Sequence, residues 1–335
     1  MSHNHGVIRL QVSPAQIYVG RYEALPYPNL TPAQEFVFEV AILAAAPVTI
    51  SDVLFQTYSG SQLLSERRRN GRSLARLIGE EFPVRVVPGE GLALRRCYFW
   101  EPGLEKLTQV FITVTARTED GAEQQAAWGA PLLIYEQTVD LRLPFRDTWW
   151  TIMGNDWTDL HKGEPISQPF ALDFARLGPD NGTFRGSGLA LADHYSFGEP
   201  VLAPADGEVV ILTADMPDNP PGTPPQLRDL REDPRRSFGN ALFIAHNDHE
   251  FSFLAHLQAG SISVPTGATV ARGQEIARCG NSGLSPGPHL HYHLQNGPNL
   301  YVDQGVPVQF GRFRVTGDVV ERSAIPTRLI VTPVD

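Results

Sequence analysis

The 335-residue sequence predicts a mainly β protein with two domains, an immunoglobulin- or fibronectin-like sandwich over residues 1–140 and a glycine-rich antiparallel sheet over residues 141–335. Three observations favour this fold class. The chain has 28 prolines and 30 glycines, which interrupt it too often for long helices. Short apolar runs recur about every 8–15 residues in the first part, as they do in β-sandwiches. Strand-like segments in the second part are separated by glycines, which is typical of a sheet with tight turns.

The first 140 residues contain strand-like segments and no pattern that indicates chemistry. Residues 35–50, 84–100 and 110–115 are rich in β-branched and aromatic side chains, which favour strands. Residues 61–78 are rich in arginine and leucine and predict one helix, although Gly71 argues against a long one. We therefore expect this domain to position or bind rather than to catalyse.

Composition and charge exclude several classes of protein. The chain has 27 Lys and Arg against 37 Asp and Glu, and this excess of acid disfavours binding to nucleic acid or to anionic lipid. The longest apolar run, residues 40–46, is much shorter than the ~20 residues that cross a bilayer, so no transmembrane segment is predicted. The start of the chain has neither a basic nor an apolar region, so no signal peptide is predicted.

Cys97 and Cys279 are too far apart to suggest a disulfide framework or a metal-binding pair. The sequence predicts no particular oligomeric state.

Histidine is distributed very unevenly. Of ten histidines, none occurs from Gly6 to Leu160, and eight lie between His161 and His293. Histidine is the commonest metal ligand and the usual acid or base near neutral pH. Any chemistry is therefore expected in the second half of the chain.

The densest histidine motif follows a loop rich in glycine and proline, residues 280–288. His289, His291 and His293 alternate with apolar residues in the segment that comes next. Because positions i and i+2 of a strand point to the same face, these three imidazoles are expected to project together, with Leu290, Tyr292 and Leu294 buried behind them. A histidine pair on a strand with an apolar back is far more specific than an isolated His-x-His.

Five segments of the second half resemble, in order, those of a known family. The segments are residues 203–209 around Asp206-Gly207, 239–244, 253–257, 267–276 and 280–291. They are similar to the lysostaphin-type zinc metallopeptidases, which cut peptide cross-links of bacterial peptidoglycan. The resemblance extends over about residues 154–295 and implies the duplicated hybrid motif fold of that family. Residues after Gln295 carry no motif and are expected to add strands at its periphery.

The resemblance implies one Zn²⁺ per chain, held by a histidine, an aspartate and the second histidine of the His-x-His pair, His291. Asp173, in an apolar segment, matches the aspartate. The commonest family spacing places the other histidine four residues earlier, where this chain has Pro169, which has no ligating side chain. A longer-spaced variant of the family motif matches His161, which we expect to be the ligand, with His194 as the alternative.

The resemblance also assigns a pair of imidazoles to catalysis. His256 and His289 are expected to hydrogen-bond the attacking water and the developing oxyanion, one of them acting as general base. Three protein ligands leave an open position for water, as in catalytic zinc sites. His293 is expected either behind the ligands or at a packed edge, and we favour the edge. The proline-rich segment 215–236 is expected to form a loop that borders the groove.

The resulting expectation is a zinc metalloendopeptidase that hydrolyses peptidoglycan cross-links or stem peptides. The resemblance implies a periplasmic or extracellular location, although no signal peptide is predicted in this chain. One alternative is a catalytically inactive relative that acts as a cell-wall binding or hydrolase-activating module, which Pro169 favours. A second is a non-haem iron oxygenase with two histidines and one carboxylate. The glycine-rich loop and the wide spacing between His161 and Asp173 argue against it.

Overall fold

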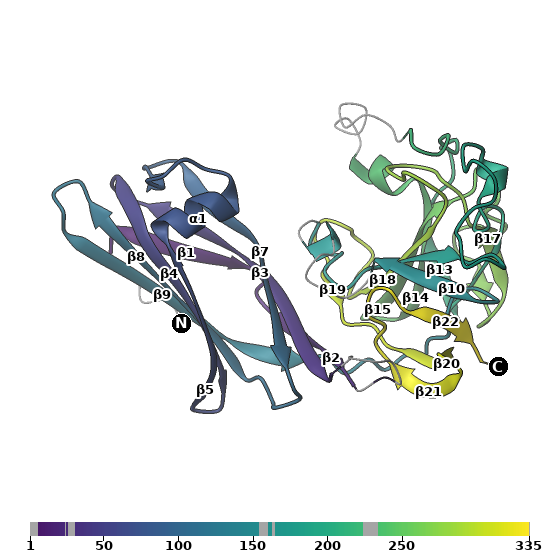
Figure 1. Ribbon diagram of the computed structural model, residues 1–335, viewed down its shortest axis with the longest axis horizontal. Helices are drawn as coiled ribbons and strands as arrows, with labels where there is room; N and C mark the ends of the chain where they lie inside the picture. The colour runs from purple at the N-terminus through teal and green to yellow at the C-terminus, as the bar shows by residue number, and fades with distance from the viewer. Residues whose placement is uncertain are drawn as a thin grey trace. The chain divides into compact units, whose positions relative to one another are not determined.

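The computed structural model describes residues 6–23, 25, 31–153, 160–162, 165–223 and 234–334. The chain divides into two compact units, one formed by residues 1–19 and 33–135 and the other by residues 20–32 and 136–335 (Figure 1). Both units are built mainly from β-strands, as predicted, and each contains one large sheet. Among the described residues, no helix combines the length and apolarity that crossing a membrane requires.

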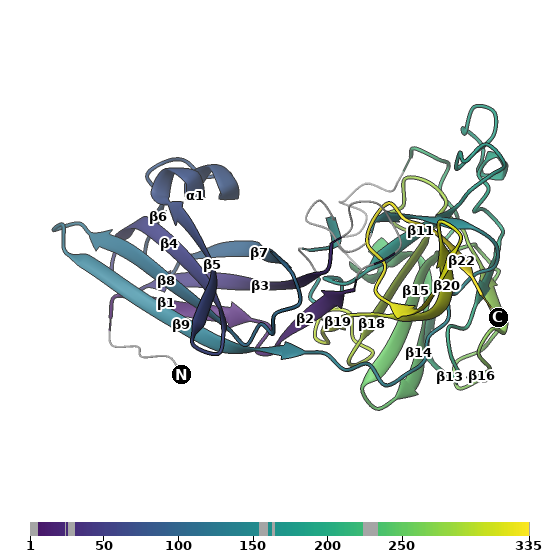
Figure 2. The ribbon, with the colours of Figure 1, turned by 60° about the horizontal axis from the view of Figure 1, so that its bottom comes forward.

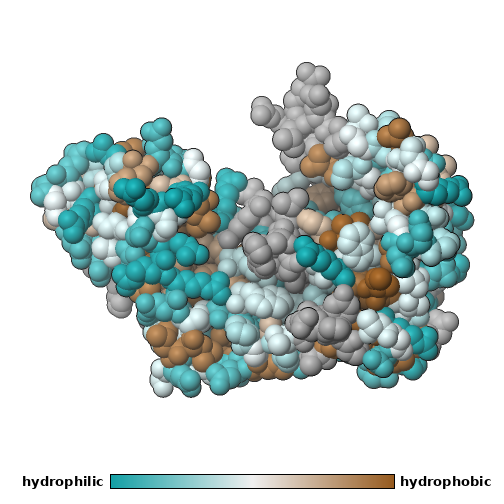
Figure 3. All heavy atoms as spheres, in the orientation of Figure 1, coloured by the Kyte–Doolittle hydropathy of each residue, from teal (hydrophilic) through white to brown (hydrophobic). Residues whose placement is uncertain are grey.

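The first unit contains a nine-stranded sheet with the order β1-β3-β2-β9-β8-β4-β5, to which β6 adds beside β4 and β7 beside β3. Its elements are β1 (Ile8–Ser13), β2 (Ile17–Tyr22), β3 (Ala33–Ala44), β4 (Val48–Ser59), β5 (Gln62–Asn70), α1 (Gly71–Ile78), β6 (Arg85–Val86), β7 (Gly91–Pro102), β8 (Gln109–Thr118) and β9 (Glu123–Ile134). Strand β8 shows the alternation expected of a half-buried strand, with Val110, Ile112 and Val114 fully buried. On the face of this unit that Figure 3 shows, hydrophilic residues predominate, which is typical of a solvated surface.

The single helix predicted over residues 61–78 is wrong. Residues 62–70 form β5, which pairs with β4, and only residues 71–78 are helical. The helix begins where Asn70 accepts a hydrogen bond from the Ser73 N–H, and it ends at Gly79, whose φ of 72° is favourable for glycine. Pairing with β4 therefore overrides the local helix propensity of the arginine- and leucine-rich residues.

The second unit contains an eleven-stranded sheet with the order β16-β13-β14-β15-β18-β11-β10-β22-β20-β21, with β19 beside β18, and a separate β12-β17 ribbon. Its strands are β10 (Trp149–Met153), β11 (Leu172–Arg176), β12 (Pro200–Leu202), β13 (Gly207–Thr213), β14 (Asn240–Asn247), β15 (Glu250–Leu257), β16 (Thr269–Val270), β17 (Glu275–Arg278), β18 (Leu290–Gln295), β19 (Gly305–Val306), β20 (Phe310–Val315), β21 (Asp318–Ser323) and β22 (Ile330–Pro333). Three 3-10 turns are η1 (Leu160–Lys162), η2 (Leu191–Asp193) and η3 (Pro234–Phe238).

Strand β18 lies in the middle of this sheet, between β15 and β11, and Figure 2 shows β14, β15 and β18 side by side. Every residue of β18 is buried. Its apolar residues, Leu290, Tyr292 and Leu294, are fully buried, as predicted. His293 therefore lies in a central strand, and the edge position that we favoured for it is wrong.

The loop predicted over residues 215–236 is only partly described, because residues 224–233 lie outside the described residues. In the described part, the Asn219 side chain donates to the carbonyl of Asn281 at 2.9 Å, and the Gly222 N–H donates to the carbonyl of Pro286 at 2.7 Å. The start of this segment is thus fixed to the glycine-rich loop that precedes β18.

Candidate metal centre

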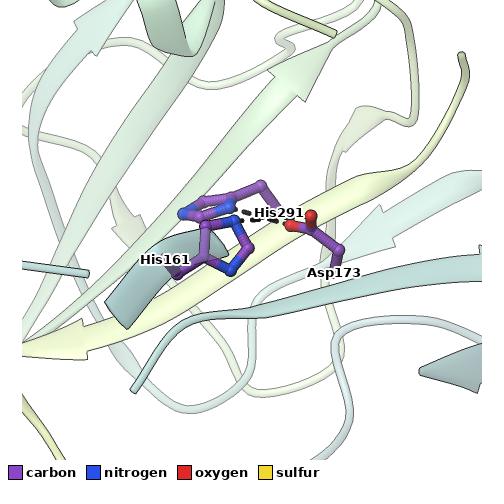
Figure 4. A group of neighbouring side chains, drawn as sticks. All are labelled: His161, Asp173 and His291. Atoms are coloured by element: carbon purple, nitrogen blue, oxygen red, sulfur yellow. Dashed lines mark hydrogen bonds and ion pairs between the residues drawn. The ribbon is translucent and has the colours of Figure 1, made fainter. Parts of the chain in front are cut away.

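Three potential ligands converge in the second unit. His161 lies on η1, Asp173 on β11 and His291 on β18, and one ligand atom from each lies within 4.8 Å of the others. His291 Nδ1 is 2.9 Å from Asp173 Oδ1, and His161 Nε2 is 3.4 Å from Asp173 Oδ2. Figure 4 shows both imidazoles turned toward the carboxylate. Within the described residues, no other group of histidine, cysteine or acidic side chains converges in this way.

The strand register places two of these ligands opposite each other. Asp173 pairs with His291 across β11 and β18, and His291 pairs in turn with Ala255 of β15. Since paired residues of neighbouring strands share a face, the carboxylate and the imidazole meet on the same side of the sheet. Phe174 takes the other side and packs against Phe145.

His161 reaches the carboxylate from a turn rather than from the sheet. The neighbouring Lys162 is buried, donates a hydrogen bond to the carbonyl of Pro169 and lies 5.5 Å from the ring of Phe170. The turn is thereby fixed to the segment that leads into β11. Pro169, at the position of the usual family histidine, contributes its carbonyl to this anchor. The sequence analysis did not identify Lys162 as an anchor, because no sequence pattern marks a lysine that the fold buries.

A chain of buried hydrogen bonds lies behind His291. His291 Nε2 is 3.1 Å from His293 Nδ1, and His293 Nε2 is 2.7 Å from Gln295 Oε1. The Gln295 amide nitrogen donates to the carbonyl of Gly297, so its oxygen must face His293 and accept. His293 therefore carries its proton on Nε2, its Nδ1 accepts, and His291 donates through Nε2. Sequence reasoning missed Gln295, although the same i, i+2 alternation that groups the histidines leads to it.

This proton arrangement leaves a lone pair on His291 Nδ1, directed at the Asp173 carboxylate. Two electron-rich atoms 2.9 Å apart require a cation between them, either a proton or a metal ion. Burial lowers the pKa of His291, which disfavours the proton. Burial alone would raise the pKa of Asp173, but the neighbouring imidazoles of His161 and His289 lower it below its ordinary value, so the carboxylate stays charged. The nitrogen and oxygen donors fit a divalent transition metal.

His256 and His289 lie beside this cluster, with ring centroids 4.7 Å apart. His256 Nδ1–H donates to the carbonyl of Ser282 and His289 Nδ1–H to that of Gly287, both at 2.8 Å. Because a carbonyl can only accept, the Nε2 atom of each neutral ring keeps its lone pair. His289 Nε2 is 3.6 Å from Asp173 Oδ2. Burial and the neighbouring His289 hold the pKa of His256 well below its ordinary value. In the neutral form, each ring therefore presents an Nε2 lone pair beside the cluster.

Backbone conformation and close packing fix this second pair. His256 has a φ of 58°, a left-handed conformation that is uncommon outside glycine and that often occurs at functional sites. The loop that carries the Ser282 carbonyl lies directly against Gly239. A Cβ on Gly283 would lie 2.3 Å from the Gly239 nitrogen, and Gly283 has a φ of 74°. Only glycine allows this approach, which positions the acceptor for His256.

A cavity of about 1140 Å³ opens onto these side chains. His161, Asp173, His256, His289 and His291 all line it, together with mainly apolar residues such as Trp150, Ile152, Phe184, Leu284 and Tyr301. His194, the alternative ligand, also lines the cavity, but its Nε2 is 2.9 Å from the carbonyl of Gly188 and it lies outside the three-residue cluster.

Comparisons with known proteins match part of the second unit. A model of the family described as Peptidase family M23 matches residues 187–308, which include His256, His289 and His291 but not His161 or Asp173. The peptidoglycan DD-endopeptidase ShyA of Vibrio cholerae is 30% identical over 148 residues, 44% of this chain and 25% of that protein. An uncharacterized metalloprotease of Haemophilus influenzae is 31% identical over 99 residues, 30% of this chain and 16% of that protein. The chain thus matches a quarter or less of the length of these relatives.

Among solved structures, the catalytic domain of lysostaphin from Staphylococcus simulans is 19% identical, with 48% of this chain and 88% of that chain covered and a TM-score of 0.28. The family match includes the histidine motif of β18 and six of the eleven strands of the large sheet. The C-terminal half of this chain is therefore an M23, lysostaphin-like peptidase domain, and it is preceded by an additional β-rich region.

Proposed function

We propose that the second unit is a zinc metalloendopeptidase that hydrolyses peptide bonds of peptidoglycan. The observation that carries the proposal is the convergence of His161, Asp173 and His291 beside the paired rings of His256 and His289, in one cavity. Peptidoglycan as the substrate is supported by the V. cholerae relative, whose name states that activity. The peptidase family match argues against a non-haem iron oxygenase.

The proposed ligand set explains how the chain prepares a metal for hydrolysis. Two neutral histidines and one carboxylate leave a net charge of +1 on a divalent ion and an open position for water. Zn²⁺, when bound, lowers the pKa of a water molecule and polarises the scissile carbonyl. Asp173 stays charged and His291 presents Nδ1 because its Nε2 is engaged by His293. His161 contributes Nε2 from its anchored turn.

The proposed catalytic pair acts through its Nε2 atoms. His256 and His289 donate through Nδ1 to fixed carbonyls, so each ring is held in place with an available lone pair. One ring accepts the proton of the attacking water as it adds to the carbonyl carbon. The protonated ring returns that proton to the leaving amine. The other ring stabilises the oxyanion when it is in the imidazolium form, whose Nε2–H donates to that oxygen. The division of these roles between His256 and His289 stays open in this proposal.

The domain predicted over residues 1–140, which includes the first unit, is proposed to position or bind, and residues 141–335 are proposed to carry the catalytic domain. Its similarity to an immunoglobulin or fibronectin sandwich stays a prediction. Side chains with metal-ligating chemistry do not converge among its described residues.

The test is hydrolysis of purified peptidoglycan sacculi by the full-length, zinc-supplemented chain, read as new amino groups and as fragment masses. We expect cleavage by the wild type and none by Asp173→Ala. Asp318→Ala, at an exposed position of β21, is the matched control and should cleave normally. A zinc-loaded wild type that releases no new amino groups would favour the inactive, binding or activating relative instead.

A further inference from the structure

A second cavity, of about 510 Å³, lies on the same sheet as the candidate metal centre. Trp150, Leu177 and Ile330 give it an apolar floor, and its polar residues are Asn181, Arg314, Thr316, Arg328 and Thr332. None of these polar residues belongs to the proposed catalytic machinery. The cavity therefore has no role in the function proposed above.

The two arginines of this cavity carry uncompensated charge. Arg314 and Arg328 are both exposed, and among the described residues neither side chain has a hydrogen-bond or ion-pair partner. Other arginines nearby are paired, since Arg312 lies 3.3 Å from Glu321 and Arg176 lies 2.9 Å from Asp147. A guanidinium group presents a fork of N–H donors that matches a carboxylate. Both arginines line the same cavity, so both can donate to an anion there.

The backbone around the cavity is unusual as well. Five non-glycine residues in the described part of the chain have a positive φ, and three of them line this cavity: Asn181 at 59°, Thr316 at 50° and Arg328 at 69°. A β-branched residue such as threonine rarely adopts this conformation. One of the other two is His256, in the proposed catalytic pair. Such conformations concentrate at binding and catalytic sites.

The cavity shares one lining side chain, Trp150, with the cavity at the candidate metal centre. Trp150 lines both cavities, and it pairs with Ala175 of β11 on one side and Ile330 of β22 on the other. Arg314 of β20 pairs with Thr332, two residues beyond Ile330. Asp173 is two positions from Ala175, so these paired side chains all lie on the face of the sheet that carries the metal centre.

The strand order sets the distance between the two sites. Across the sheet, three strand spacings of about 4.8 Å separate β11 from β20. Along the strands, Asp173 and Arg314 are offset by about four residues. Together these two offsets place Arg314 roughly 19 Å from Asp173. An extended peptide rises about 3.3 Å per residue. An extended peptide whose scissile bond lies at the metal centre would therefore reach the two arginines with a residue about five or six positions away.

We propose that this cavity is a substrate subsite, in which Arg314 and Arg328 bind a carboxylate of the peptide about five or six residues from the scissile bond. The apolar floor with Trp150 takes the hydrocarbon part of the residue that carries this carboxylate. The inference rests on the proposed function, because the substrate is the peptide whose bond lies at His161, Asp173 and His291. The subsite would select peptides that carry a carboxylate at this distance from the scissile bond, a selection that the catalytic residues do not make.

The test compares intact peptidoglycan sacculi with sacculi whose free carboxylates have been converted to amides. The double variant Arg314→Gln/Arg328→Gln should raise KM for intact sacculi about fivefold to thirtyfold with kcat changed less than twofold, because exposed charge pairs contribute modestly. On amidated sacculi the double variant and the wild type should have equal KM values. Arg312→Gln, on the same strand and outside the cavity, is the matched control and should behave as the wild type.

Sedimentation with sacculi separates failure of this inference from failure of the proposed function. In an Asp173→Ala background, which cannot cleave, the double variant should still bind intact sacculi about fivefold to thirtyfold more weakly, and added salt should reduce the difference. If the wild type cleaves nothing but this binding difference is found, the subsite stands and the proposed hydrolysis is wrong. If the wild type cleaves and the double variant equals it in KM and in binding, or differs only in kcat, the subsite is wrong.

Discussion

Removing the imidazole behind His291 should weaken metal binding without touching a ligand. His293 accepts a hydrogen bond from His291 Nε2. With a metal bound, that proton could not move to Nδ1, because Nδ1 is the atom proposed to hold the metal. In His293→Phe the metal-free His291 can shift its proton to Nδ1 and donate to Asp173, whereas the metal-bound form keeps a buried, unsatisfied N–H. The free-energy cost of the unsatisfied N–H therefore destabilises only the metal-bound form.

The expected loss follows from that cost. An unsatisfied buried donor costs about 1–3 kcal/mol, and a tenfold change corresponds to about 1.4 kcal/mol. Loss of the hydrogen-bond partner of a metal-bound histidine typically lowers the affinity for the metal by about 10–100-fold. We therefore expect the Kd for Zn²⁺ of His293→Phe to rise about 10–100-fold, and that of Gln295→Leu to rise less.

The assay is competition for Zn²⁺ against a chromogenic chelator at pH 7.5, with the electronic spectrum of the Co²⁺-loaded chain as an independent readout of the ligand environment. His246→Phe is the matched control, because it also removes a hydrogen-bonded histidine, whose partner is Ser252, away from the metal cluster. A folded His293→Phe chain that binds Zn²⁺ within twofold of the wild type would refute the reasoning.

Three further predictions concern turnover, pH and folding. His256→Ala should abolish hydrolysis, because it removes one of the two rings proposed to act in catalysis, while zinc content measured by mass spectrometry stays near one per chain. Burial lowers the pKa of His256, His291 and His293 in the metal-free fold, so the unfolded chain takes up more protons below about pH 6.5. The free energy of unfolding in EDTA should therefore fall from pH 7.5 to 5.5, by up to about 1.4 kcal/mol per pH unit for each histidine. Glu250→Ala should lower the free energy of unfolding of the second unit by about 2–4 kcal/mol in urea, because this buried carboxylate accepts hydrogen bonds from Thr138, Val139 and Asn247.

Each of these predictions has a contradicting outcome. Loss of zinc in His256→Ala would make His256 a ligand rather than a base. A free energy of unfolding that is constant or higher at pH 5.5 would mean that the buried histidines are already charged in the fold. Glu321→Ala removes an exposed ion pair and should cost under about 1 kcal/mol. A Glu250→Ala chain no less stable than this control would mean that Glu250 does not anchor residues 138–139.

The sequence predicts alternation within a strand better than the order of strands in a sheet. The shared face of His289, His291 and His293 is predicted from their spacing and from the loop before them. In the structure, His289 and His291 both lie within 3.6 Å of Asp173, and His293 Nδ1 lies 3.1 Å from His291 Nε2. The position of β18 between β15 and β11 depends on pairing between distant segments, so the edge position of His293 was wrong. Register between distant strands also decides that Asp173 lies opposite His291.

The same limit explains the failed helix. Residues 62–70 have side chains that suit a helix, but β4 offers a pairing partner, and Arg67 lies 4.7 Å above the ring of Phe99 and 3.2 Å from Glu101. These contacts come from β7, which the local sequence does not reveal. Local propensity is a weak guide when tertiary contacts compete with it.

The zinc content of the full-length chain and of single-ligand variants tests the account most directly. The account predicts one Zn²⁺ per wild-type chain after dialysis, and loss of that zinc in His161→Ala and Asp173→Ala but not in His194→Ala. A His161→Ala chain that keeps its zinc, with His194→Ala losing it, would contradict the proposed ligand set.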